Sequence, residues 1–98
     1  MPECRWAVPA DHPAFAGHFP GRPILPGVVI LDQVVHGAAQ VLGCPPAGCR
    51  ISTAKFLRPV APGETLDFAF DAASETGLRF RVYVAGNIVA NGNIEWPD

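Results

Sequence analysis

The segment Gly27–Leu42, GVVILDQVVHGAAQVL, decides the fold because it predicts a single long helix. Pro26 suits the first turn of a helix, where its missing N–H costs no hydrogen bond. Gly43, followed by two nearby prolines, is expected to end the helix. At 1.5 Å per residue the helix spans roughly 25 Å. Because it is apolar nearly all round, we expect it to be buried on most sides.

Extended segments lie on both sides of this helix. A short strand is predicted over Cys4–Val8, ahead of a proline-rich loop that cannot hold regular structure. Turn signals and partial alternation of apolar and polar residues predict four further strands, Arg50–Val60, Thr65–Ala72, Leu78–Val84 and Ile88–Trp96. Gly92 inside the last strand suggests a β-bulge. We expect an α+β fold in one domain, residues 1–98, with an antiparallel sheet of about five strands wrapped on one central helix.

Three polar residues of the helix, Asp32, His36 and Gln40, stand four residues apart and so form one narrow stripe. An aspartate is almost never fully buried without a partner, because removing its charge from water is costly. A solvent-facing helix usually carries Lys or Glu, and this helix has neither. We therefore favour a stripe that faces a small polar cavity. A stripe that simply faces solvent is the alternative.

The loop before the helix supplies a second candidate, His18, within GHFPGRPILPG. Prolines restrict the backbone of this loop and glycines permit unusual turns. A rigid loop that holds an imidazole beside a helix N-terminus is suited to position a general base. A loop histidine without a function is the alternative, and it is the reading preferred for His12.

The stretch GHFPGRPILPGVVILDQVV, Gly17–Val35, resembles the active-site signature of the β-hydroxyacyl-acyl carrier protein dehydratases, which have the hot-dog fold. A second stretch, AKFLRPVAPGETL, Ala54–Leu66, resembles the RRPV-xPGD-like strand and turn of that family. The resemblance implies a homodimer in which the histidine of one protomer faces the acid of the other. The matching positions are His18 and Asp32. Assembly into a hexamer, or into a heteromer with another hot-dog subunit, stays open.

The resemblance also implies a reaction. A (3R)-3-hydroxyacyl thioester on the phosphopantetheine arm of an acyl carrier protein loses water and becomes the trans-2-enoyl thioester, in fatty acid or polyketide-type synthesis, with no metal and no other cofactor. His18 suits removal of the proton α to the carbonyl. Asp32 can protonate the departing hydroxyl if an apolar environment keeps the acid protonated. The N–H of Gly27 at the helix N-terminus suits the charge on the thioester oxygen. Alternatively, His18 handles both proton steps.

Three features depart from the common family pattern. The helix and strand that common members carry before the first strand have no counterpart, so we expect one strand fewer. The acid is Asp32 where the commonest branch has Glu, which predicts a tighter pocket. His36 stands where many members have Gln; it is a candidate for orienting Asp32 by a hydrogen bond, with a neutral interface or core histidine as the alternative. The short chain and the Asp-x-x-x-His spacing resemble the dehydratase-like subunits of aryl-polyene-type synthases.

Two other functions stay open. A hot-dog acyl thioesterase uses an acid on the same helix but has no particular need for His18. A non-catalytic subunit of a heteromeric hot-dog dehydratase would only shape the tunnel of its partner. The presence of both His18 and Asp32 argues against the second alternative.

The amino-acid composition excludes several classes of protein and of binding site. The 98 residues are 49% hydrophobic with a net charge of -2, and the seven Lys and Arg are scattered, which argues against disorder and against a nucleic-acid binder. Three cysteines without a CxxC pair fit neither a disulfide framework nor a zinc site. No signal peptide or membrane-spanning run is recognised, so we expect a cytoplasmic protein. Candidates for steering an acidic acyl carrier protein are Arg22, Lys55 and Arg58, with ordinary solvated charges as the alternative.

Overall fold

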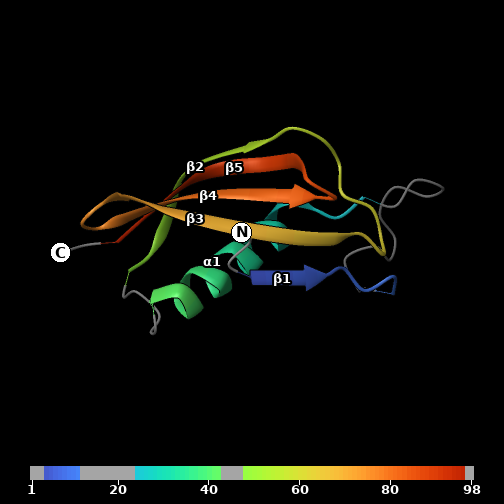
Figure 1. Ribbon diagram of the computed structural model, residues 1–98, viewed down its shortest axis with the longest axis horizontal. Helices are drawn as coiled ribbons and strands as arrows, with labels where there is room; N and C mark the ends of the chain where they lie inside the picture. The colour runs from blue at the N-terminus through green and yellow to red at the C-terminus, as the bar shows by residue number, and fades with distance from the viewer. Residues whose placement is uncertain (1–3, 12–23, 43–47, 97–98) are drawn as a thin grey trace.

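The computed structural model describes residues 4–11, 24–42 and 48–96. Within these ranges one helix and five strands form two layers, with the helix lying on one face of a curved sheet (Figure 1). The elements in chain order are β1 (Cys4–Ala7), α1 (Gly27–Leu42), β2 (Arg50–Phe56), β3 (Thr65–Ser74), β4 (Gly77–Val84) and β5 (Asn87–Glu95). The expected α+β arrangement of one helix on a five-stranded antiparallel sheet is confirmed.

The strands are ordered β1-β3-β4-β5-β2, and every neighbouring pair is antiparallel. The three consecutive strands β3, β4 and β5 form the centre, while β1 and β2 form the two edges. The turn between β4 and β5 places Ala85 at φ 50° and Gly86 at φ 83°. Two successive positive φ angles match the tight hairpin turns whose twist agrees with that of the strands.

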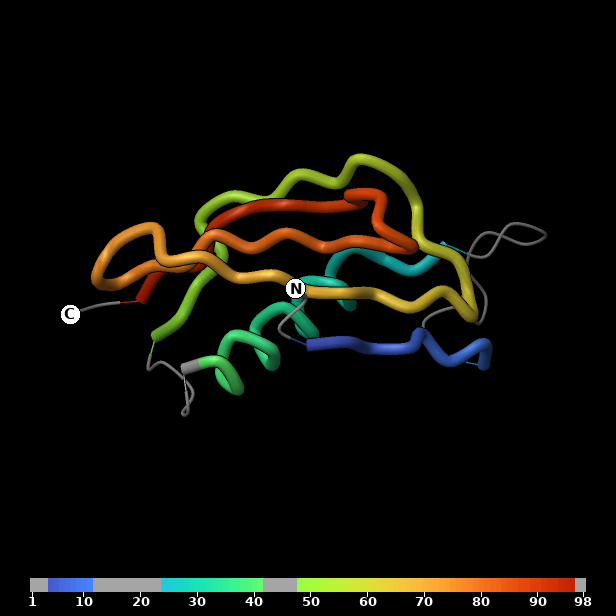
Figure 2. The backbone as a smooth tube through the Cα atoms, viewed as in Figure 1, coloured from blue at the N-terminus to red at the C-terminus, as the bar shows by residue number. Residues whose placement is uncertain are grey.

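The second strand is shorter than the sequence predicts, since β2 ends at Phe56 and not at Val60. Leu57 N–H still donates to the Val89 carbonyl, at 2.8 Å. Beyond it, Pro59 has no N–H to continue a ladder. Val60 instead accepts a hydrogen bond from Leu25 N–H, at 2.8 Å, so the chain has left the sheet to meet the segment before the helix (Figure 2). The other predicted strand boundaries differ from the observed ones by one or two residues.

Gly92 on β5 is a close-contact position and not the predicted bulge. Its pairing with both neighbouring strands is unbroken, and the register between β4 and β5 shifts three residues earlier, at Val89, which the pairing skips. A Cβ on Gly92 would collide with the Thr53 carbonyl oxygen and would lie 2.7 Å from the Phe80 ring. Glycine is therefore required because the Phe80 ring and the backbone of β2 both press against this position.

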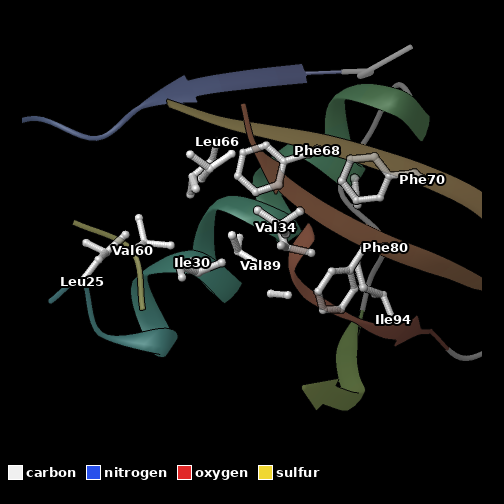
Figure 3. Close-up of a cluster of buried hydrophobic side chains, with 14 of the residues drawn as sticks. Leu25, Ile30, Val34, Val60, Leu66, Phe68, Phe70, Phe80, Val89 and Ile94 are labelled. Carbon is white, nitrogen blue, oxygen red and sulfur yellow. The ribbon is translucent and has the colours of Figure 1, made fainter. Parts of the chain in front are cut away.

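The core lies between α1 and the sheet (Figure 3). Ile30, Val34 and Ala38, spaced four residues apart on the helix, are at most 3% exposed, and they meet the apolar face of the strands. The strand residues alternate as expected, with Leu66, Phe68 and Phe70 buried along β3. The remaining buried apolar residues are Val8, Leu25, Val60, Leu78, Phe80, Val82, Val84, Val89, Ala90 and Ile94.

The expectation that the helix is buried on most sides holds except along one stripe. The exposed positions are Val28, Asp32, His36 and Gln40, with Val41 in the last turn, and the other positions up to Ala39 are buried or partly buried. Val28 is 72% exposed and Val41 40% exposed. Within the described residues no other element covers the stripe that faces away from the sheet. No helix in the described part of the chain is long and apolar enough to cross a membrane.

Replacing Gly92 with alanine tests this packing. Because the added methyl meets both a backbone carbonyl and the Phe80 ring, we expect Gly92→Ala to lower the free energy of unfolding by about 2–3 kcal/mol, measured by urea denaturation. Gly86→Ala is the control: no atom lies within 4 Å of its Cβ, so only its positive φ is penalised, by roughly 1 kcal/mol. Equal losses in the two variants would contradict the close contact.

Candidate functional site

An open groove of about 500 Å³ lies where the start of α1 meets the end of β2. The hydrogen bond from Leu25 to Val60 holds the two walls together, and Figure 3 shows these residues beside Ile30 at one end of the core. The lining is mainly apolar and consists of Ile24, Leu25, Gly27, Ile30, Phe56, Leu57, Arg58, Pro59 and Val60. The groove therefore suits an apolar chain or a thioester arm better than a charged group.

Gly27, the predicted thioester-binding residue, lines this groove as the first residue of α1. The first N–H groups of a helix have no partner within the helix, and no described residue accepts a hydrogen bond from Gly27 N–H. The ring of Phe56 lies directly against this glycine, with ring atoms 2.7–3.2 Å from the position that a Cβ would occupy. A larger residue than glycine would displace the ring. The structure thus adds Phe56 to the groove at the predicted thioester site.

Asp32 and His36 lie side by side on an uncovered face of α1, with side chains 65% and 66% exposed. The polar stripe is therefore open in the single chain, and the small polar cavity favoured from the sequence is not formed by the described residues. His36 Nδ1 lies 2.7 Å from the backbone carbonyl of Asp32 and 3.6 Å from its carboxylate. A carbonyl oxygen only accepts hydrogen bonds, so Nδ1 carries the hydrogen. The hydrogen bond holds the main chain of Asp32, and the role of His36 in orienting the carboxylate stays a prediction.

Arg58, a predicted carrier-protein contact, is engaged within its own chain. Its guanidinium reaches the Glu64 carboxylate at 3.2 and 3.4 Å and donates to the Pro59 carbonyl at 2.8 Å. Glu64 also accepts from the Ala61 N–H, at 2.8 Å. The hydrogen bond from Arg58, and then that from Ala61, hold the pKa of Glu64 below its usual value. The pair fastens the turn between β2 and β3, and Arg58 also lines the groove.

The remaining predicted residues are only partly placed. His18 and Arg22 lie outside the described residues, so whether the loop brings His18 to an acid stays a prediction. Lys55 is exposed on β2, directly before Phe56. Successive strand residues point to opposite faces, so Lys55 faces away from the helix that Phe56 touches.

Phe56 is the residue that the sequence reasoning missed. The second family-like stretch contains it, but apolar residues in a strand are ordinarily assigned to the core. Its side chain is instead 45% exposed and lies at the groove. The available sequence signal is Pro59, three residues later, which has no N–H to continue a ladder and so places Phe56 near the end of the strand.

Sequence and structure comparisons agree on one group of proteins. The ApeI-like family, described as ApeI dehydratase, matches residues 2–93. The 3-hydroxyacyl-[acyl-carrier-protein] dehydratase FabZ of Symbiobacterium thermophilum is 44% identical over 100 residues, which cover 91% of this chain and 70% of that enzyme. FabZ of Chlamydia trachomatis serovar L2 is 34% identical over 102 residues, which cover 91% and 67%.

A solved structure gives the same result. The dehydratase heterocomplex ApeI:P from Xenorhabdus doucetiae superimposes with a TM-score of 0.76 at 32% identity, covering 93% of this chain and 81% of that one. The five-stranded antiparallel sheet on one helix is therefore the hot-dog fold, as the sequence resemblance implies.

The contact between Arg58 and Glu64 predicts a pH-dependent stability. The lowered pKa of Glu64 means that its ionised form stabilises the fold above the usual glutamate range, and that this contribution is lost as pH falls through the folded pKa. We expect Glu64→Gln to unfold at lower urea concentration than wild type at neutral pH, with a loss of about 1 kcal/mol, and the difference to shrink as the pH falls below the usual glutamate range. Glu75→Gln, in the β3–β4 turn, is the control and should change little. A difference that persists undiminished at acid pH would contradict the assignment.

Proposed function

The chain belongs to the ApeI-like dehydratase family, and from this membership we propose that it dehydrates a (3R)-3-hydroxyacyl thioester, carried by an acyl carrier protein, to the trans-2-enoyl thioester. The observation that carries the proposal is the position of Asp32 on α1, the helix whose first residue, Gly27, opens the apolar groove. Five residues along a helix correspond to a rise of about 7.5 Å, which is within the length of one short substrate, although Asp32 lies on the exposed side of α1 and does not itself line the groove.

In the proposed reaction the imidazole of His18 takes the proton from the carbon α to the thioester carbonyl. Electrons of that C–H bond form the new double bond as the bond from carbon 3 to its hydroxyl breaks. The hydroxyl leaves as water with a proton from Asp32. The N–H of Gly27 stabilises the negative charge that builds on the thioester oxygen during this step.

The exposure of Asp32 supports a site completed by a second hot-dog subunit. A proton-transferring acid works best in a water-excluded site, and this side chain is mostly exposed in the single chain. Val28, one turn before it, is exposed as well, which is typical of a surface that another chain covers. We propose that a second subunit covers this face and brings its own His18 to Asp32.

Whether the second subunit is identical stays open between two arrangements. A homodimer has two identical sites, whereas the similar Xenorhabdus doucetiae structure is a heterocomplex. The heteromer is the second candidate, and in it this chain is either the catalytic subunit or a subunit that shapes the tunnel. The proposed substrate places the protein in the cytoplasm, where carrier-bound acyl chains are made.

Mass spectrometry of a (3R)-3-hydroxyacyl-acyl carrier protein after incubation with the purified protein tests the function. We expect the carrier-bound chain to lose the mass of one water. Release of free acid instead would identify a thioesterase. An unchanged substrate, with the partner subunit also supplied, would contradict the proposal.

Two substitutions assign the roles within the site. We expect His18→Ala and Asp32→Ala each to lower kcat by about 10²–10⁴, because each removes a proton-transferring group, while thermal unfolding stays close to wild type. Glu75→Gln is the control and should retain turnover. If either alanine variant keeps near wild-type turnover, the assignment of that residue is wrong. Mixing the two inactive variants should restore part of the activity if the histidine and the acid come from different subunits.

A further inference from the structure

Basic side chains gather on the face of the sheet that α1 does not cover. Along β4 the buried residues Leu78, Phe80 and Val82 alternate with Arg79 and Arg81, so the two arginines face away from the helix. Directly opposite residues of antiparallel strands point to the same face. The residues paired across β5 and β2 therefore complete a surface, named here the outer basic surface: Thr53, Lys55, Arg79, Arg81, Asn91 and Asn93.

The charges of this surface are only partly neutralised. Arg81 forms an ion pair with Asp71, yet its Nε is buried without a hydrogen-bond partner. Arg79 and Lys55 make no ion pair or side-chain hydrogen bond with any residue in the described ranges. By contrast, Arg50, on the same face, is paired with Glu95 at 3.0 Å. The outer basic surface thus presents excess positive charge on a protein whose net charge is -2.

The surface is shaped as well as charged. A shallow hollow of about 180 Å³ lies at its centre, lined by Thr53, Arg79, Arg81, Ile88, Asn91, Gly92 and Asn93. The hydrogen bond from Asn93 Nδ2 to Thr53 Oγ1, at 2.9 Å, fixes one wall. Arg79 and Arg81 line the hollow, and the guanidinium of Arg81 is held by the carboxylate of Asp71. Such a hollow fits the carboxylates of an acidic protein segment.

We propose that the outer basic surface is the docking site of the acidic acyl carrier protein, an inference that rests on the proposed function. Carrier proteins are acidic, so their charge complements this face. The other described cation near the groove, Arg58, is already paired with Glu64. On the described outer face Lys55 and Arg79 form no ion pair: Asp71 stands opposite Arg79 in the sheet, but its carboxylate contacts Arg81.

The position of β2 links this surface to the groove. Lys55 faces the outer basic surface, and its neighbour Phe56 lines the groove on the other face of the same strand. The strand ends at Phe56, and the following segment also lines the groove. A flexible phosphopantetheine arm from a carrier on the outer face therefore needs to pass only around the end of β2 to reach Gly27.

Binding of the apo carrier protein, which lacks the arm, tests the docking surface independently of catalysis. We expect the double variant Lys55→Gln/Arg79→Gln to weaken binding roughly tenfold in biolayer interferometry, and added salt to weaken binding of the wild type. The single variant Arg79→Gln, expected to lose part of the binding, is compared with the control Arg50→Gln, which also removes one positive charge from the same face, but one that Glu95 already neutralises. Equal binding by wild type and the double variant, or equal losses in the double variant and the control, would overturn the proposal.

Kinetics with two substrates separates docking from the reaction. The double variant should raise KM for the carrier-bound substrate about tenfold with kcat unchanged, and leave turnover of the same acyl chain on pantetheine alone at the wild-type value. A parallel loss with both substrates would place the effect in the active site and overturn the docking role. If wild type turns over neither substrate with the partner subunit also supplied, the proposed function fails, while the binding measurement still decides whether an acidic carrier protein docks on this face.

Discussion

The contact between one face of α1 and the apolar face of the sheet is the constraint on which the rest of the structure depends. Ile30, Val34 and Ala38 are the helix side of this contact, and Phe68 and Phe80 are prominent on the sheet side. Burial of side chains such as these contributes about 1.5–3 kcal/mol each for the larger residues, which makes this layer the main source of stability in so short a chain. The same contact sets the direction of the helix, and with it the position of Gly27 at the groove.

A single sheet can bury only one side of a helix, and that limit shapes the functional surface. The side of α1 that turns away from the sheet keeps an apolar residue, Val28, beside the polar pair Asp32 and His36. Val28, 72% exposed one turn before Asp32, places an apolar side chain next to the carboxylate on this uncovered face. The proposed catalytic acid and the expected subunit contact therefore share one helix face, so assembly and activity are coupled.

The sequence predicted the elements well because their signals are local. Pro26 correctly predicts the start of the helix, and the alternating residues predict β3 to within two residues of its observed bounds. It failed where the outcome depends on contacts between distant segments. The hydrogen bond from Leu25 to Val60, beyond the end of β2, and the contact of the Phe80 ring with Gly92 join segments that are distant in sequence, and neither has a local sequence pattern. The open stripe on α1 likewise depends on how much of the helix one sheet can cover.

The two faces of the sheet suit two different tasks of a carrier-dependent enzyme, binding of the thioester and docking of the carrier. The helix-side face is apolar and holds the groove, where the thioester has to be shielded from water. The opposite face holds Lys55 and Arg79, whose charges would be costly to bury and are better used against an acidic partner in water. Because Lys55 and Phe56 are neighbours on β2 and face opposite sides of the sheet, carrier docking and thioester binding take place on the two sides of the same strand. Recognition of the carrier and the chemistry on its cargo can therefore change independently, since substitutions on one face of β2 leave the other face intact.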